Sequence, residues 1–296
     1  MHKYIGYLQI LLAAALWGLL GPVSKYGLHE GMTPFELAFW RATLGAFFFF
    51  LHSLKHQSLK VKKSDAPIFL IFGVLGIALF FGSYQAAVKH IGASVSAILL
   101  YTAPIWVAIF SRILFKESLS TGKILALSVA LTGTALVCFA DQGTDFSLPL
   151  MGILFGLLSG LTYSLHYIFG KTFLKNYEAA TLYTWCLPAG AIALLPWVEF
   201  SHYTPIKLIV VVTLGFLCTY AAYYAYCAGL KRLEATQAAI IANVEPVIAA
   251  GLAFLWWDEQ LSIPAYFGGV LVISAVIIIA KLPESPKATA SVPTAE

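Results

Sequence analysis

The chain has 296 residues, of which 60% are hydrophobic and only 11% charged, and its formal net charge is +4. Soluble domains are about 45–50% apolar and about 25% charged. The composition, with a mean hydropathy of +0.83, therefore excludes a secreted enzyme, a nucleic-acid-binding module and a disordered chain, and it indicates that lipid surrounds most of the protein.

Ten apolar stretches follow one another along the chain, each near the roughly 20 residues that a helix needs to cross a bilayer core. They are continuous rather than alternating, which favours membrane helices over the strands of a barrel. The stretches run over residues 4–26, 35–54, 67–88, 93–115, 123–140, 150–170, 179–198, 207–229, 235–257 and 264–281. The first is too long for the apolar part of a signal peptide and is predicted to remain as a membrane helix. Residues 283–296, rich in Pro, Ser, Thr and Ala, are predicted to form a disordered cytoplasmic tail.

Lysine and arginine are concentrated in alternate connecting segments. If the N-terminus is cytoplasmic, 14 of the 18 basic residues lie in or beside cytoplasmic segments, three belong to external ones, and Arg41 lies within a span. Cytoplasmic segments of membrane proteins carry such an excess of positive charge. The sequence thus predicts a multi-pass protein of the cytoplasmic (inner) cell membrane with both termini in the cytoplasm.

The two halves of the chain repeat one another. A shift of 142 residues, without gaps, aligns eleven identical residues between positions 84–120 and 226–262. Each half holds five predicted spans, an odd number, so the second half must enter the membrane in the opposite orientation. We therefore expect an all-α integral membrane fold of ten transmembrane helices in two inverted five-helix repeats, at 1–141 and 149–282. Inverted repeats are typical of secondary transporters, whose halves exchange conformations during alternating access.

Short motifs mark several of the predicted spans, and one of them, which ends a helix, occurs once in each half. They are Ala15-Leu16-Trp17-Gly18 and Lys25 in the first span, Pro34 and Leu37-Ala38-Phe39-Trp40-Arg41 in the second, and two helix-ending copies, Phe115-Lys116-Glu117-Ser118-Leu119-Ser120 and Trp257-Asp258-Glu259-Gln260-Leu261-Ser262. With these motifs the chain resembles the drug/metabolite transporter superfamily, specifically its EamA type, over roughly residues 5–281. Before the second copy stands Glu245-Pro246, whereas the first has Ala103 in place of the glutamate. The resemblance implies ten helices around a central cavity, alternating access, and a small organic metabolite as cargo, with export of amino acids or related compounds favoured.

Glu245 and Arg41 are ionisable residues inside predicted spans and are the first candidates for function. An intramembrane carboxylate is costly and by default faces a cavity or a partner, so Glu245 is a candidate proton carrier for coupling. The alternative is a structural carboxylate that pairs with Arg41 or with backbone opened by Pro246. Arg41 can grip a substrate carboxylate with two hydrogen bonds, or it can extend to the headgroups or pair with an acid instead.

Hydroxyl-bearing aromatic residues recur at helical spacing on several spans. Because buried hydroxyls need partners in lipid, a shared polar face is expected to point at the bundle interior or at a wet cavity, although helix packing is the alternative for any single residue. The candidate cavity residues besides Arg41 are Tyr84, Tyr101, Tyr163, His166, Tyr220, Tyr224 and Asn243. Such a pocket suits an aromatic or amphipathic solute, or a quaternary amine held by cation–π contact, so uptake of a choline-like cation is the alternative to export.

Motifs of known catalytic and metal-binding sites are missing from the sequence. The four cysteines are isolated, and no HExxH, P-loop or GxSxG motif occurs. We therefore expect no catalytic residues, no bound metal and no cofactor; an intramembrane enzyme and a non-transporting sensor are the rivals from other classes. The expected partners are a small-molecule solute, protons if Glu245 couples transport, and the lipid bilayer, but not nucleic acid. The oligomeric state is left open.

Overall fold

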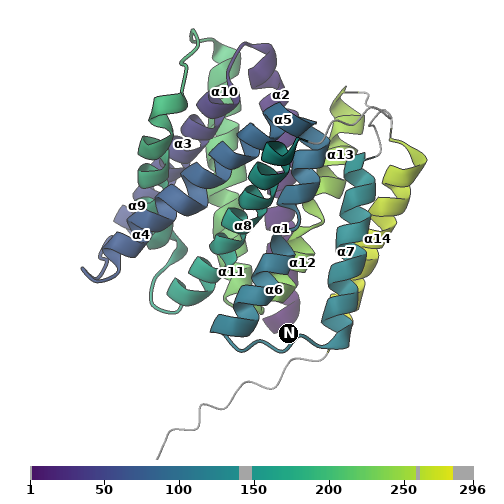
Figure 1. Ribbon diagram of the computed structural model, residues 1–296. Coiled ribbons are helices and arrows are strands. Elements are labelled where there is room, and N and C mark those ends of the chain that lie inside the picture. The colour runs from purple at the N-terminus through teal and green to yellow at the C-terminus, as the bar shows by residue number, and fades with distance from the viewer. Residues whose placement is uncertain (1, 140–148, 258–260, 283–296) are drawn as a thin grey trace, which may run out of the picture.

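The computed structural model describes residues 2–139, 149–257 and 261–282, and it contains helices but no β-strand in these ranges (Figure 1). In the first half the helices are α1 (His2–Gly18), α2 (Leu20–His29), α3 (Pro34–Lys55), α4 (Ala66–Phe72), the π-helix η1 (Gly73–Leu79), α5 (Phe80–Leu100), α6 (Ala103–Leu114) and α7 (Thr121–Phe139). In the second half they are α8 (Leu150–Phe173), α9 (Ala179–Leu194), the short 3-10 helix η2 (Leu195–Trp197), α10 (Pro205–Gly215), the π-helix η3 (Phe216–Ala221), α11 (Ala222–Leu230), α12 (Ala235–Ala242), α13 (Glu245–Trp257) and α14 (Ile263–Lys281). The tail predicted at 283–296 lies outside the described residues.

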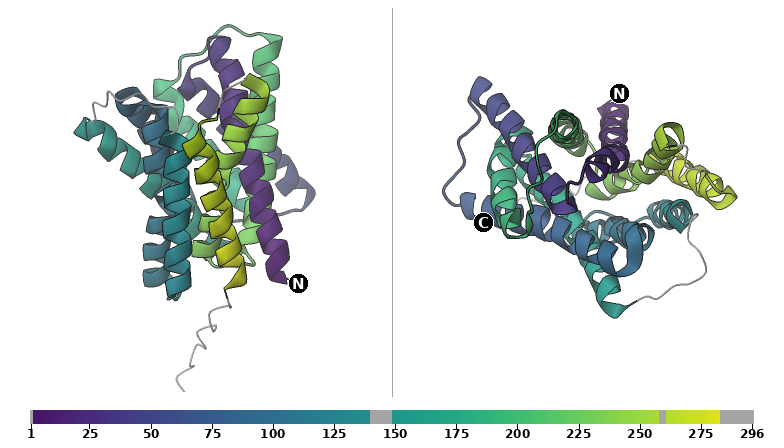
Figure 2. Two further views of the ribbon diagram at one scale, coloured as in Figure 1. Left: turned by 90° about the vertical axis from the view of Figure 1, so that its right-hand side faces the viewer. Right: turned by 90° about the horizontal axis from the view of Figure 1, so that it is seen from above.

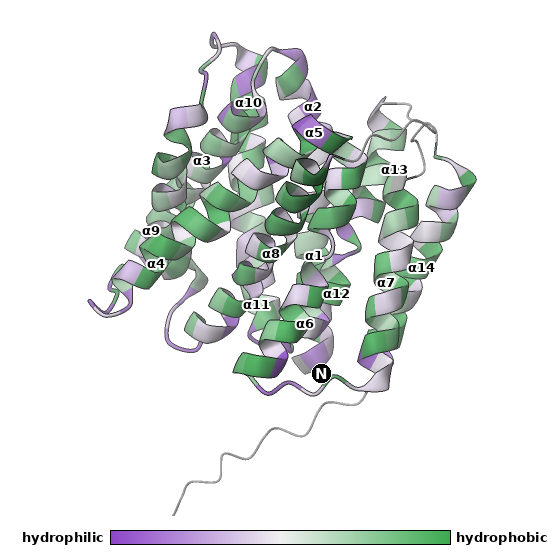
Figure 3. Cartoon of the chain, in the orientation of Figure 1, coloured by the Kyte–Doolittle hydropathy of each residue, from purple (hydrophilic) through white to green (hydrophobic). Residues whose placement is uncertain are grey.

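The all-helical membrane fold predicted from the sequence is confirmed. Within the described residues, nine helical stretches are long and apolar enough to cross a membrane, and α6 adds a shorter apolar helix. Large apolar side chains such as Leu150, Ile192, Ile209 and Leu255 are exposed on the outside of the bundle. Figure 3 shows apolar residues along most of the helices and hydrophilic residues gathered near the connections. This surface suits lipid rather than water.

The connections gather at two ends of the bundle (Figures 1 and 2). One end, called here the basic end, carries the start of α1, the end of α14 and the α3–α4, α6–α7, α8–α9 and α11–α12 connections. Contacts tie these segments together: Lys3 Nζ donates to the Leu282 carbonyl oxygen at 2.7 Å, and the Tyr177 hydroxyl donates to Asp65 at 2.6 Å. The opposite end carries the α2–α3 and α9–α10 connections. Both ends of the described chain therefore lie at the basic end.

Two helix irregularities occur in both halves at the spacing of the sequence repeat. The π-helices η1 and η3 end at Leu79 and Ala221, which are 142 positions apart. The turns that end α5 and α12 lie at Tyr101 and Asn243, again 142 positions apart. Each half thus contains one span with a π-helical segment and one span divided near its middle.

The predicted span at 93–115 is not one straight helix. Gly92 breaks α5 with φ 76° and ψ 165°, a conformation that is essentially restricted to glycine. The chain turns again at Tyr101, and α6 restarts with Pro104 in its first turn, where the missing N–H leaves no helical hydrogen bond unmade. The predicted third and fourth spans are therefore separated by a break at a single glycine, and α6 completes the fourth.

Helix α8 packs closely against α5 through three small residues. Gly152, Gly156 and Gly160 recur at four-residue intervals, and a Cβ atom at Gly160 would lie 2.7 Å from the Leu99 carbonyl oxygen. Glycines at this spacing let two helix backbones approach one another. The close packing fixes the position of Tyr163, one turn further along α8, in the middle of the bundle.

Candidate functional site

A cavity of about 590 Å³ lies between the two halves of the bundle. Leu28 and Pro34 line it near the opposite end, and Tyr163 and Tyr223 line it at mid-length of the helices. No residue of the basic-end connections is among those that line it. The cavity therefore extends from the centre of the bundle toward the opposite end, and its volume suits a small organic molecule.

Arg41 brings a positive charge into the cavity wall. It lies two turns inside α3 and is 8% exposed, and its Nε donates to Thr219 Oγ1 of η3 at 3.0 Å. The Thr219 hydroxyl in turn donates to the Leu214 carbonyl oxygen at 2.9 Å, and the Arg41 guanidinium lies 5.0 Å from the centre of the Phe81 ring. These contacts hold the guanidinium at the cavity rather than at the headgroups, where a long basic side chain would otherwise extend.

Glu245 brings a carboxyl group to the same cavity. It is the first residue of α13, directly after the turn that ends α12, and it lines the cavity together with Tyr101. The N-terminus of a helix carries partial positive charge, which stabilises an acid in the first turn. Arg41 lies close enough for an electrostatic interaction with this carboxyl group. Among the described residues that line the cavity, Arg41 is thus the one basic residue and Glu245 the one acidic residue.

Aromatic side chains form much of the remaining wall. Trp17 packs edge-to-face against Tyr163 and Tyr223, with ring centroids 6.5 and 5.8 Å apart, and Tyr163 stacks on Phe80 at 5.2 Å. Trp17 Nε1 is buried without a hydrogen-bond partner in the part of the chain that the structure describes. Stacked rings offer faces to an apolar or cationic group, and the indole N–H offers a donor.

Five of the residues singled out from the sequence line this cavity. They are Arg41, Tyr84, Tyr101, Tyr163 and Glu245. They come from α3, α5, the turn after α5, α8 and α13, so the fold brings together segments from both halves of the chain.

The other four lie elsewhere. The His166 ring is buried, with Nε2 2.6 Å from a carbonyl oxygen of η1, and Asn243 is 3% exposed in the turn before α13. Tyr220 and Tyr224 lie on the outer face of the bundle, where Tyr224 is 48% exposed and the Tyr220 hydroxyl is 2.8 Å from His52 Nδ1.

The two outer tyrosines form a pair: the rings of Tyr220 and Tyr224 stack with their centroids 6.4 Å apart. The spacing of Tyr220, Tyr223 and Tyr224 places them on one face of a regular α-helix. Successive residues of a helix point about 100° apart, so Tyr223 and its neighbour Tyr224 face in different directions. Of the three, Tyr223 lines the cavity and the others do not.

Two further features were not among those predicted from the sequence. Cys138, near the end of α7, lines the cavity, although an isolated cysteine in an apolar helix is usually buried packing. His52 in the last turn of α3 and His56 directly after that helix are four residues apart, and their ring centroids lie 4.7 Å apart on the outer face. That i, i+4 spacing is visible in the sequence. Among the described residues, no three His, Cys, Asp or Glu side chains are grouped so that they could hold a metal ion.

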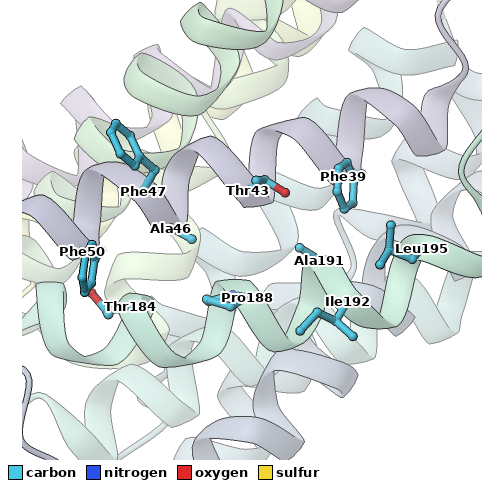
Figure 4. A pocket seen from close by; sticks show the side chains of 10 residues that line it. All are labelled: Phe39, Thr43, Ala46, Phe47, Phe50, Thr184, Pro188, Ala191, Ile192 and Leu195. Carbon is cyan, nitrogen blue, oxygen red and sulfur yellow. The ribbon is translucent and has the colours of Figure 1, made fainter. Parts of the chain in front are cut away.

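A second hollow, of about 430 Å³, lies between α3 and α9 (Figure 4). It is lined by Phe39, Thr43, Ala46, Phe47, Phe50, Thr184, Pro188, Ala191, Ile192 and Leu195. Two threonine hydroxyls are the only polar side-chain groups in this set. With no charged group, the hollow suits an apolar chain, and the cavity with Arg41 and Glu245 is the better candidate for a polar solute.

Comparison with known proteins gives the family. The model of the EamA-like transporter family matches residues 4–139 and again residues 150–281. The uncharacterized transporter YdfC of Bacillus subtilis is 28% identical over 270 residues, which cover 90% of this chain and 87% of the relative. The uncharacterized inner membrane transporter YicL of Salmonella typhimurium is 23% identical over 287 residues, covering 93% and 94%.

A solved crystal structure has the same fold. It superposes with a TM-score of 0.80 at 18% sequence identity, covering 94% of this chain and 95% of that chain. The family and the relatives indicate a transporter of small solutes rather than an enzyme. With the family model matching in both halves, the chain belongs to the EamA-like transporter family and is a multi-pass membrane transporter.

Proposed function

We propose that the protein is a secondary transporter that moves a small dipolar metabolite, an amino acid or a related compound, across the cytoplasmic membrane by alternating access. The observation that carries this proposal is the presence of Arg41 and Glu245 in one aromatic cavity of about 590 Å³. Export is the favoured direction, in line with the resemblance of the sequence.

The charges of the cavity complement those of an amino acid. A guanidinium binds a carboxylate with two parallel hydrogen bonds, and the Arg41 Nε already held by Thr219 orients the group. An ammonium group is attracted to the faces of aromatic rings and to an acid, and Tyr101 and Glu245 supply both. The unpartnered Trp17 N–H adds a donor for a solute oxygen.

Uptake of a choline-like cation is the second candidate, because the rings of Trp17, Tyr84 and Tyr163 line the same cavity. Arg41 counts against it, since a guanidinium in the wall repels a solute that is only cationic. A direct comparison of the two solute classes decides between the candidates.

The halves at 1–141 and 149–282 are proposed to be inverted repeats that exchange conformations. The two matches of the family model and the recurrence of the π-helix and of the divided span support this organisation. The charge asymmetry supports a cytoplasmic location for the basic end and for both termini. The cavity then faces the outside in the present conformation.

Solute counterflow in proteoliposomes tests the proposal. Vesicles loaded with an amino acid should accumulate the same labelled amino acid, saturably and chemically unchanged, and faster than they accumulate choline. Counterflow of choline alone would replace the first candidate with the second. Release of an altered product would indicate an intramembrane enzyme, and binding without flux would indicate a sensor.

A further inference from the structure

The two halves meet at the basic end through a buried carboxylate. Glu117, just after α6, is 7% exposed and accepts hydrogen bonds from the start of α12. The donors are the Ala235 backbone N–H at 2.9 Å, the Thr236 backbone N–H at 3.3 Å and the Thr236 hydroxyl at 2.9 Å. The N-terminus of a helix carries partial positive charge and unpaired N–H groups, which an anion satisfies.

An ion pair next to this contact also joins the two halves. Lys123, in the first turn of α7, is 2% exposed, and its Nζ lies 2.5 Å from the Glu234 carboxylate, at the residue before α12. The same ammonium donates to the Ser118 carbonyl oxygen at 2.6 Å. We call Glu117, Lys123, Glu234, Ala235 and Thr236 together the clasp. Glu117 and Lys123 belong to the first half of the chain, and Glu234, Ala235 and Thr236 belong to the second half.

The clasp lies where the cavity is closed. None of its residues is among those that line the cavity. The contacts of the clasp hold the α6–α7 connection and the first turn of α7 against the start of α12.

The counterparts of two clasp residues in the first half of the chain line the cavity, whereas the clasp residues themselves do not. By the shift of 142 residues, Ala93 and Ser94 correspond to Ala235 and Thr236. Ala93 and Ser94 follow the break at Gly92 and line the cavity, whereas Ala235 and Thr236 are held by Glu117. If the halves exchange conformations, the start of α12 is the segment that becomes open to the cavity.

We propose that Glu117 is a positioning residue that keeps the cavity closed at the basic end, and that the transporter opens there when the Glu117 carboxylate leaves α12. The proposal rests on the alternating access proposed above. A carboxylate that served only to complete the fold would stabilise α12 without affecting the far side of the cavity.

Cys138 provides a native reporter on that far side. Of the four cysteines it is the one that lines the cavity, and Cys186, Cys218 and Cys227 are 0–1% exposed. We would measure its labelling by a polar maleimide in purified protein held in nanodiscs, where both faces are accessible. Hydrogen exchange of the peptide that spans residues 231–242 reports opening of the clasp.

Glu117→Gln removes the charge and places an amide donor against the N–H groups of α12. We expect exchange at the start of α12 to rise roughly two- to thirtyfold, as for loss of a helix cap, and Cys138 labelling to fall roughly twofold or more as the population shifts toward closure of the far side. Thr236→Val removes one hydrogen bond at nearly constant shape. Thr236→Val should raise exchange at the start of α12 and lower Cys138 labelling, each by less than Glu117→Gln does. If Glu117→Gln does not yield folded protein, Thr236→Val tests the proposal in its place.

Glu178→Gln is the matched control. It breaks the exposed Lys231–Glu178 ion pair at the same end, which measures 3.1 Å and joins two residues of the second half. Exposed pairs contribute little, so both measurements should stay at the wild-type level. Faster exchange with unchanged Cys138 labelling, or equal effects of Glu178→Gln, would overturn the proposal. Neither readout uses a solute, so absence of counterflow would count against transport and not against the clasp.

Discussion

Glu245 occupies the first position of α13, where α12 has just ended, and Tyr101 and Arg41 are its neighbours at the cavity. In the proposed alternating access, a carboxyl group in such a place would change its surroundings each time the cavity changed the side to which it opens. Water and the guanidinium favour the anion, and loss of water favours the neutral acid. This is the physical basis for proposing that Glu245 carries a proton.

The first prediction tests proton coupling. Glu245→Gln keeps the size and hydrogen-bonding capacity of the side chain but cannot titrate. We expect a pH gradient to accelerate solute counterflow by the wild-type protein in proteoliposomes, and we expect the variant to retain counterflow without that acceleration. Glu36→Gln is the control. The Glu36 carboxylate accepts a hydrogen bond at 2.8 Å from Ser201, which lies in the α9–α10 connection, and this variant should keep the acceleration. An undiminished response to the gradient in Glu245→Gln would refute coupling through this residue.

The second prediction concerns Arg41. Arg41→Lys keeps the positive charge but loses the planar fork that pairs with a carboxylate. Since a hydrogen bond to a charged group contributes about 1.5–3 kcal/mol, the apparent affinity for an amino acid should fall roughly tenfold or more. Thermal-shift titration of the detergent-solubilised protein measures this affinity. Equal affinities of the wild type and the variant would remove Arg41 from the binding site.

At the scale of helices, Gly92 is the position where the backbone itself limits the sequence. A Cβ atom at Gly92 would meet open space, as would one at Gly82 in the regular part of α5. The two positions therefore differ in backbone conformation and not in packing.

The third prediction compares alanine at these two glycines. Gly92→Ala should lower the free energy of unfolding by about 1–3 kcal/mol, because the positive φ is strained for any residue with a side chain. Gly82→Ala should be neutral or stabilising by up to about 1 kcal/mol, since alanine is the better helix former. Thermal unfolding in detergent distinguishes them. Similar effects of both substitutions would mean that the break at Gly92 does not persist.

Some features of the helices could be predicted from the sequence, and others could not. Apolar runs of membrane length predicted the order of the spans, and an ionisable residue in lipid drew attention to Arg41 and Glu245, both of which line the cavity. The direction of Tyr220 and Tyr224 was not accessible, because the three tyrosines cover a broad helix face and the sequence does not tell which edge of that face meets the cavity. The break at Gly92 was also hidden, since an isolated glycine in an apolar run is compatible with an unbroken helix.

At the scale of the whole molecule, the basic end should face the cytoplasm. Lys60 and Lys175 are exposed at that end, and Tyr203, 71% exposed, lies in the connection at the opposite end. The distribution of lysine and arginine gives the expected orientation.

The fourth prediction follows from this orientation. Single cysteines introduced at Lys60 and Lys175, in a background without the native cysteines, should react with an impermeant reagent in permeabilised cells alone. A cysteine at Tyr203 should react in intact cells. The reverse pattern would invert the topology and place the cavity mouth in the cytoplasm.

The hydrogen bond between Lys3 and Leu282 holds the two ends of the described chain side by side. Fluorescent proteins fused to the two termini would therefore occupy one compartment and lie within range of energy transfer. Because α1 and α14 belong to different halves, the efficiency of that transfer would report the relative movement of the halves in living cells while leaving every residue of the cavity in its native form.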